Sequence, residues 1–338
     1  MKQEVYNILL ASKTPLSAAE ISASGKISDR TYVSKILGEL AEEGKVESIR
    51  DGKSVKYRVV DYVVFLEKNL NLKKVKEDEI WTEIKKSECF AEHLCERLEN
   101  IIYFAFTEML NNAIDHSKSS VGYTKIWLEE NSIQFVVRDK GIGVFRNFMA
   151  KKKLPDEITA IQELIKGKQT TMPKWHSGEG IFWVSKLADS FSLSSYGTKL
   201  IVDNSINEYT VDKGAPKVVG TEVYFSIAVN SKKSLQKLFE KYALERDKYS
   251  FTTTEIPVRL FEEGEVWISR SQAKKIVNGL ERYKKVIFDF KSIKLVGQGF
   301  ADEIFRVFRK MHPEIILEPI NMNKSVELMV RRAMNDDM

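Results

Sequence analysis

The first 60 positions carry apolar residues at helical spacing in three stretches and at alternating spacing after them. Ser17 is placed to cap the second helix and Gly25 to end it. Apolar and polar residues alternate on both sides of Asp51-Gly52, a dipeptide that predicts a β-hairpin between two such runs. We therefore expect three helices and a hairpin over the stretches KQEVYNILLAS, SAAEISAS, SDRTYVSKILGELAEEG and KVESIRDGKSVKYRVV.

The next stretch, EKNLNLKKVKEDEIW, is highly charged, and we interpret residues 61–80 as a linker or connecting helix. The apolar run IIYFAF then leads into TEMLNNAIDHS, which together predict a long buried helix. KIWLEE and SIQFVVRD alternate like two hairpin strands around Glu130-Asn131. The last segment, 251–338, alternates between strand and helix patterns three times, which predicts a small α/β domain.

The composition is that of an ordinary globular protein, with 338 residues, 43% hydrophobic and 30% charged. This length favours two or three domains. No apolar run approaches the roughly 20 residues that span a membrane, and the N-terminus lacks a signal-peptide pattern. We therefore expect no contact with a membrane. Cys89 and Cys95 have no metal-ligand spacing and give no disulfide framework, which fits a reducing cytoplasm. A net charge of +5 permits nucleic-acid binding on a local patch without requiring it.

Four polar residues of TEMLNNAIDHS, Glu108, Asn111, Asn112 and Asp115, recur at helical spacing and line one face of the helix. Taken alone, this stripe is most simply the solvated face of an amphipathic helix. It becomes a candidate ligand-binding face because three further motifs follow it along the chain.

The first of these motifs is DxGxG, formed by Asp139, Gly141 and Gly143 at the end of the strand SIQFVVRD. A carboxylate at the end of a buried strand faces a pocket, and glycines let a flat ligand approach the backbone. The alternative is a tight turn that begins with an aspartate.

The other two motifs are Gly178-Glu179-Gly180, which opens a helix, and Gly220-Thr221, which precedes the strand EVYFSIAV. Free backbone N–H groups at a glycine-rich helix start form an anion site, and the alternative is a loop before a capped helix. The threonine can donate a hydrogen bond to a ligand or can simply favour the strand.

The four motifs, in this order and spacing, closely resemble the GHKL ATPase family of histidine kinases, MutL-type repair proteins, type II topoisomerase subunits and anti-sigma kinases. The resemblance implies a two-layer α/β sandwich over 81–230 that binds ATP and Mg²⁺. Glu108 matches the general base, Asn112 the Mg²⁺ ligand and Asp139 the residue that reads adenine. The adenine-pocket glycines, the phosphate-binding glycines and a threonine near adenine are matched by Gly141, Gly143, Gly178, Gly180 and Thr221.

The N-terminal order of three helices and a hairpin resembles a winged helix-turn-helix domain over residues 1–60. In that family the third helix enters the major groove and the wing contacts the backbone. The resemblance implies duplex DNA as a partner, although a winged helix that binds protein stays open. The basic residues placed for DNA contact are Arg30, Lys35, Arg50, Lys53 and Lys56.

The segment 251–338 resembles a STAS-like domain, closest to an uncharacterised variant often fused to such ATPases, which implies docking of a protein partner. Typical anti-sigma antagonists are phosphorylated on a serine just before the helix that begins here near Gly299. Gly297-Gln298-Gly299 offers no hydroxyl at that point, and Ser292 lies several residues earlier. We therefore assign no catalytic role to this segment.

The fold class that we expect is a multidomain α+β protein, and three activities fit it. The first is an ATP-binding regulator whose slow ATPase cycle repositions the flanking domains. The alternatives are an anti-sigma-type Ser/Thr kinase that acts on a separate partner and a non-catalytic nucleotide-sensing transcription regulator. A typical histidine kinase is disfavoured, because HLCERL around His93 lacks the acid and proline of the phosphoacceptor box. The oligomeric state, including a homodimer, is left open by the sequence.

Overall fold

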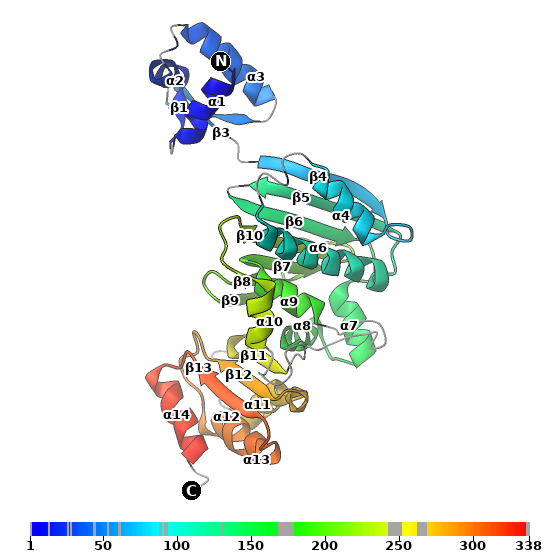
Figure 1. The fold of residues 1–338 in the computed structure, drawn as a ribbon. Coiled ribbons are helices and arrows are strands. Elements are labelled where there is room, and N and C mark those ends of the chain that lie inside the picture. Colours follow the sequence, from blue (N-terminus) through cyan, green and yellow to red (C-terminus); the bar gives the residue numbers. More distant parts are fainter. Residues whose placement is uncertain are drawn as a thin grey trace.

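Three parts follow one another along the chain in the computed structural model, with the N-terminus at one end and the C-terminus at the other (Figure 1). Helices and several sheets occur together, so the mixed α/β, multidomain class expected from the sequence is confirmed. The structure describes residues 2–12, 14–25, 27, 29–42, 45–52, 54–59, 62–87, 90, 94–129, 131–167, 179–242, 252–261 and 269–335.

The N-terminal part contains the three expected helices and the hairpin. Ser17 and Glu20 form a capping box at the second helix, and Asp29 accepts hydrogen bonds from the first backbone N–H groups of the third. Gly52 has a φ of +61° in the hairpin turn, which a glycine adopts without strain. The elements are α1 (Lys2–Ala11), β1 (Leu16–Ser17), α2 (Ala18–Ser24), α3 (Arg30–Glu42), β2 (Val46–Asp51) and β3 (Ser54–Val59). The sequence did not predict β1, which pairs with β3 in a sheet of order β1-β3-β2.

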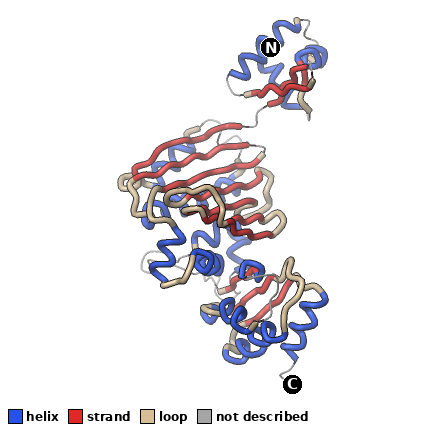
Figure 2. The backbone as a smooth tube through the Cα atoms, turned by 180° about the vertical axis from the view of Figure 1, so that it is seen from behind, coloured by secondary structure: helices blue, strands red, loops and turns tan. Residues whose placement is uncertain are grey.

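The middle part is a seven-stranded antiparallel sheet of order β4-β5-β6-β10-β7-β8-β9, covered on one face by helices (Figure 1). Figure 2 shows the opposite face, on which the strands are toward the viewer. Phe135 in the inner strand β6 contacts Phe106 of α6 and stacks on Phe225 of the central strand β10. The strands are β4 (Tyr62–Asn71), β5 (Val121–Glu129), β6 (Ser132–Asp139), β7 (Ser190–Ser195), β8 (Thr198–Asp203), β9 (Glu208–Asp212) and β10 (Glu222–Ala228). The helices are α4 (Glu77–Lys85), α6 (Glu96–His116), α7 (Val144–Lys152), α8 (Glu157–Lys166), α9 (Gly180–Leu187) and α10 (Leu235–Tyr242).

The stretch 61–80, which we interpreted as a linker, contributes to this sheet instead. Residues 62–71 form the edge strand β4, paired with β5 over nearly its whole length, and α4 begins at Glu77. Charged side chains on β4 misled the sequence interpretation, because an exposed edge strand commonly carries them. Glu67, for example, pairs with Lys125 of β5 at 2.9 Å.

The C-terminal part is a three-stranded parallel sheet of order β11-β12-β13 with helical connections. The strand expected over EIPVRLF ends at Pro257 and continues as a 3₁₀ turn. The helix expected over SRSQAKKIVNGLERY ends at Val277, and Gly279 follows with a φ of +76°. The elements are β11 (Thr253–Pro257), η1 (Val258–Phe261), α11 (Arg270–Val277), η2 (Leu280–Arg282), β12 (Lys285–Asp289), α12 (Gln298–Asp302), the π-helical η3 (Glu303–Phe308), α13 (Arg309–Met311), β13 (Ile316–Ile320) and α14 (Lys324–Asn335).

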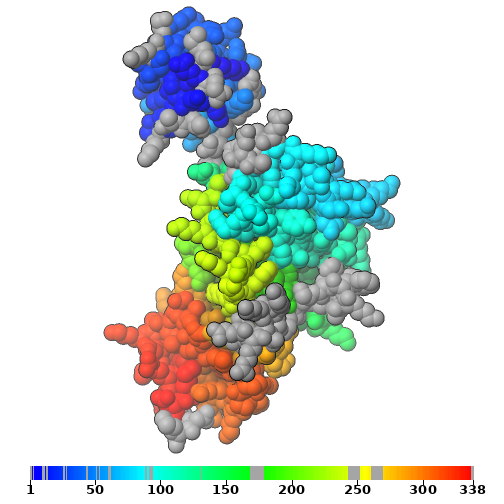
Figure 3. Space-filling model, viewed as in Figure 1, coloured from blue at the N-terminus to red at the C-terminus, as the bar shows by residue number. Residues whose placement is uncertain are grey.

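Two hydrophobic cores are present among the described residues. One lies within the N-terminal part and includes Ile21 and Leu37. The other is continuous through the middle and C-terminal parts, from Phe65 to Ala333. In the space-filling view the N-terminal part is a separate lobe, whereas the other two parts are in contact (Figure 3). The middle and C-terminal parts therefore form one packed unit.

Candidate functional site

The polar face of α6 lies against the first residue of α9. A Cβ atom built on Gly180 would lie 2.3 Å from Oε2 of Glu108 and 3.8 Å from Nδ2 of Asn112. Glu108 and Asn112 are one helical turn apart, and both are half-buried. The start of α9 therefore brings its backbone next to a carboxylate and an amide that were paired in the sequence prediction.

Asp139 ends the inner strand β6 and is 4% exposed. Its carboxylate oxygen Oδ1 accepts hydrogen bonds from the backbone N–H of Gly141 at 2.7 Å and of Thr221 at 3.3 Å. Burial raises the pKa of Asp139, and the hydrogen bonds from Gly141 and Thr221 oppose that rise without cancelling it. The structure therefore fixes one oxygen of a buried carboxylate with backbone donors.

Two glycines allow the loop after Asp139 to pack closely. A Cβ on Gly141 would lie 2.0 Å from the carbonyl oxygen of Ser117 at the end of α6. Gly143 has a φ of +82°, and a Cβ there would lie 2.4 Å from Oγ of Ser195. Any larger residue at Gly141 would push the loop away from the helix end, so glycine sets the distance between the Asp139 loop and α6.

Thr221 connects the Asp139 loop to the next helix. Its Oγ1 accepts a hydrogen bond from the backbone N–H of Val144, the first residue of α7, at 3.0 Å. Its backbone carbonyl accepts from the N–H of Asp139 at 2.9 Å. Gly220 before it has a φ of +85°, and a Cβ there would lie 2.2 Å from the carbonyl oxygen of Asp139. Thr221 thus links Asp139 to the start of α7 through its side-chain oxygen, its backbone N–H and its backbone carbonyl.

The expected nucleotide-site residues lie in two neighbouring groups along α6. Glu108, Asn112 and Gly180 form one, and the loop around Asp139 forms the other, where Gly141 packs on the end of the helix. Glu108 and Ser117 are nine residues apart, or roughly 13 Å along a helix axis, which is the scale of a nucleotide. Gly178 lies outside the described residues.

The basic residues of the N-terminal part are distributed over α3 and the hairpin. Arg30 and Lys35 are exposed on α3. Arg50 pairs with Val55 and Lys56 with Ile49, so the two basic residues point to opposite faces of the hairpin. The structure therefore does not gather them on one face. Lys53 lies outside the described residues.

Some contacts at the site could not be found from the sequence. The hydroxyl of Tyr196 donates to the carbonyl oxygen of Gly141 at 2.8 Å, and the Arg146 guanidinium lies 3.7 Å from the centre of the Tyr196 ring. Ser195 donates to the carbonyl oxygen of Gly220 at 2.8 Å. Arg146 lies in α7, and Ser195 and Tyr196 come from β7 and its following turn. Nothing in their local pattern distinguishes them from ordinary helix, strand and turn residues.

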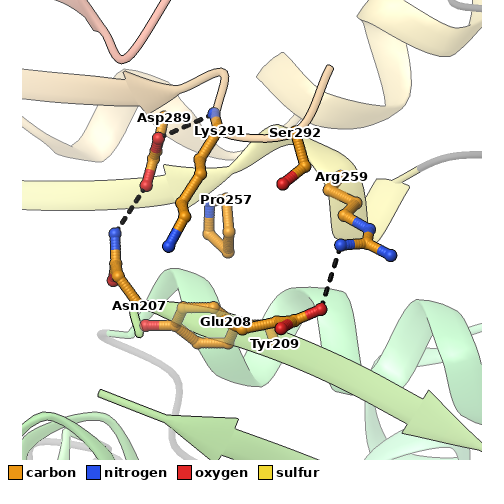
Figure 4. Close-up of a pocket in the computed structure, with 8 residues that line it drawn as sticks. All are labelled: Asn207, Glu208, Tyr209, Pro257, Arg259, Asp289, Lys291 and Ser292. Carbon is orange, nitrogen blue, oxygen red and sulfur yellow. Dashed lines mark hydrogen bonds and ion pairs between the residues drawn. The ribbon is translucent and has the colours of Figure 1, made fainter. Parts of the chain in front are cut away.

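Two hollows lie at the boundary between the middle and C-terminal parts, away from the residues described above. Figure 4 shows the smaller, where Asn207 donates to Asp289 at 2.8 Å and Arg259 pairs with Glu208 at 3.0 Å. The larger, about 880 Å³, is lined by α8, β9 and the end of α11. Both show how extensively polar side chains meet at this boundary.

The comparisons with known proteins bear only on the C-terminal part. Residues 272–327 match a family described as a STAS-like domain of unknown function (DUF4325). No curated protein matches the chain. Within the described ranges, we find neither a helix long and apolar enough to cross a membrane nor a group of three or more metal-ligating His, Cys, Asp or Glu side chains. The expectation of a STAS-like domain is thereby confirmed.

Proposed function

We propose that the middle part is a GHKL-type Mg-ATP site within a DNA-binding regulator. The observation that supports the proposal is the closeness of Gly180 to Glu108 and Asn112, because these residues are at least 68 positions from Gly180 in the chain and match the expected phosphate, general-base and metal positions. The buried carboxylate of Asp139 near the end of the same helix supports it. The proposed site therefore has a phosphate end at Glu108 and Gly180 and an adenine end at Asp139.

Each residue has a defined task in this proposal. With Oδ1 of Asp139 held by backbone donors, Oδ2 accepts from the exocyclic amine of adenine. The amide oxygen of Asn112 binds Mg²⁺, a hard cation that prefers oxygen ligands. Backbone N–H groups at the start of α9 face the phosphates. Glu108 accepts the proton of the attacking water, which gives an ATPase.

The flanking parts complete the proposed regulator. The N-terminal part, as a winged helix-turn-helix, would bind duplex DNA through α3 and the hairpin. The C-terminal STAS-like domain would dock a protein partner. Glu108 favours turnover over pure nucleotide sensing, since a sensor needs no base. A protein hydroxyl in place of water would make the same site a Ser/Thr kinase, which the experiment below distinguishes.

Mg-ATP binding and turnover by the purified chain test the nucleotide site. Glu108→Ala is expected to bind ATP with turnover reduced by roughly 100-fold or more, the usual contribution of a general base. Asn112→Ala is expected to weaken ATP binding and to slow turnover. Glu96→Ala, an exposed residue in the first turn of the same helix, is the control and should behave as wild type. Absence of ATP binding by wild type, or full turnover by Glu108→Ala, would contradict the proposal, and label on a second protein would indicate a kinase.

The pH dependence of binding gives a separate test of Asp139. Because burial raises the pKa of Asp139, ATP affinity should fall with decreasing pH earlier than a free aspartate would predict. Asp139→Asn removes this titration and should flatten the acidic side of the profile. An identical pH profile in Asp139→Asn and wild type would show that Asp139 does not contact the base.

Duplex binding tests the N-terminal part. Binding should weaken steeply with salt, and Lys35→Ala should reduce both the affinity and the salt slope, because one phosphate contact is lost. Lys68→Ala is the control, since Lys68 lies on β4 and pairs with Glu83. No mobility shift at low salt would remove DNA from the proposal while leaving the nucleotide site intact.

A further inference from the structure

Lys186, near the end of α9, carries a buried charge whose partner belongs to the C-terminal domain. Its ammonium lies 3.5 Å from Oε2 of Glu255 on β11, and both side chains are less than 10% exposed. The rings of Tyr209 and Tyr242 lie 5.2 and 5.9 Å from the same nitrogen. Withdrawing Lys186 from Glu255 would leave a charge in an apolar environment, which is strongly unfavourable.

A second buried lysine fixes the preceding helix to the same domain. The ammonium of Lys166, at the end of α8, is fully buried and donates to the carbonyl oxygen of Asn278 at 2.9 Å, just past α11. The hydroxyl of Tyr283 donates to the carbonyl oxygens of Lys166 and Gly167 at 2.6 and 2.7 Å. Both sides of the segment 168–178, which lies outside the described residues, are therefore held by the C-terminal domain.

The opposite end of α9 is the end that contacts the candidate site. Lys186 and Gly180 are six residues apart, roughly 9 Å along the axis of one short helix. In this position the carboxylate of Glu108 lies at the start of α9, where a helix favours an anion. A phosphate that takes this place must displace the carboxylate or shift α9, and a shift of α9 pulls on the Lys186–Glu255 contact.

We propose that the C-terminal STAS-like domain restrains α9 in cis through Lys186, and the end of the adjoining helix α8 through Tyr283, and so holds Gly180 against Glu108 in competition with the phosphates of a nucleotide. The nucleotide half of this inference rests on the proposed function. Nucleotide binding and tight docking of the C-terminal domain then oppose each other. By reciprocity, a protein that draws β11 away from α9 would strengthen nucleotide binding by the same factor by which the nucleotide strengthens the binding of that protein.

Lys186→Met is the variant that tests the restraint, because Glu255 keeps Lys241 at 3.0 Å and the Tyr242 hydroxyl at 2.7 Å as partners. Tyr283→Phe is a second, milder variant that removes only a hydroxyl. Lys125→Met, which breaks the ion pair with Glu67 at the far edge of the sheet, is the matched control. The first readout needs no nucleotide: hydrogen exchange should accelerate for α9 amides in Lys186→Met and for amides at the end of α8 in Tyr283→Phe, and should stay unchanged in the control.

The second readout is the Kd for Mg-ATP by calorimetry, which should decrease by roughly fivefold or more in the test variants. A residue with a merely structural role would weaken binding or leave it unchanged. Unchanged exchange of α9 overturns the restraint, whatever the nucleotide result. Accelerated exchange with an unchanged or weaker Kd overturns the competition. Accelerated exchange with no ATP binding by any variant overturns the proposed function and confirms the restraint alone.

Discussion

Glu255 provides a stability prediction that can be worked out from its surroundings. Burial raises its pKa, but the positive charges of Lys186 and Lys241 and the hydroxyl of Tyr242 outweigh burial and lower the pKa to about 2. Compared with the ordinary value of 4.5, this corresponds to roughly 3 kcal/mol, since one pKa unit is worth about 1.4 kcal/mol. Because the folded-state pKa is depressed, the contribution is complete above about pH 4.5 and is lost as the pH falls through about 2.

Glu255→Gln is therefore expected to lower the free energy of unfolding by about 3 kcal/mol at neutral pH and by roughly half of that near pH 3. The loss of the carboxylate partner of Lys186 is already contained in this figure, because the attraction to Lys186 is a cause of the depressed pKa. Urea unfolding followed by circular dichroism measures both values.

Glu83→Gln is the control for this experiment, since Glu83 pairs with Lys68 at 2.7 Å with both side chains well exposed. Exposed ion pairs contribute at most about 1 kcal/mol. A cost below about 1 kcal/mol for Glu255→Gln at neutral pH, or a cost that does not shrink on acidification, would refute the account of a charged Glu255 held by two lysines.

Three further substitutions probe other parts of the chain. Phe135→Ala should cost about 3–5 kcal/mol in urea unfolding, because the ring is fully buried and stacks on Phe225; a cost below about 2 kcal/mol would contradict that packing. Ser17→Ala removes the capping box of α2 and should destabilise the N-terminal lobe by about 1 kcal/mol, without moving the transition of the remaining parts, since the cores are separate. Gly220→Ala should cost at least about 2 kcal/mol, because the positive φ and the carbonyl of Asp139 both exclude a Cβ; wild-type stability would show that the loop relaxes freely.

Local sequence patterns predicted the elements whose burial follows their own periodicity. The long helix carrying Glu108, the hairpin at Asp51-Gly52 and the last two C-terminal strands occur where the spacing of apolar and polar residues placed them, whereas the first C-terminal strand ends earlier than expected, at Pro257. The pairing of Gly180 with Glu108 was predicted only through a family resemblance, because no local pattern relates residues so distant in the chain.

Features that depend on tertiary packing were not predicted from the sequence. Strand β4 was missed because its charged residues are typical of a linker, although Glu67 is an exposed residue of the edge strand that pairs with Lys125 of β5. Lys166 and Lys186 were missed for a related reason. Lysine normally marks a surface, and here partners from the second domain help to make its burial tolerable. Lys166 donates to a backbone carbonyl of that domain in addition to its pairing with Glu163, and Lys186 pairs with the carboxylate of Glu255.

The short passage from β3 to β4 limits how the N-terminal lobe can act. Two residues separate Val59 from Tyr62, so their Cα atoms can lie no more than roughly 11 Å apart, even with the chain fully extended. Because the lobe has its own hydrophobic core, a change in its orientation about the start of β4 would disrupt neither core, but the lobe cannot move away from the sheet. Any coupling between the lobe and the sheet must therefore act through a change in the orientation of the lobe, not through a change in its distance from the sheet. If the lobe binds a duplex as proposed, two lobes could occupy neighbouring half-sites only when two whole chains come together.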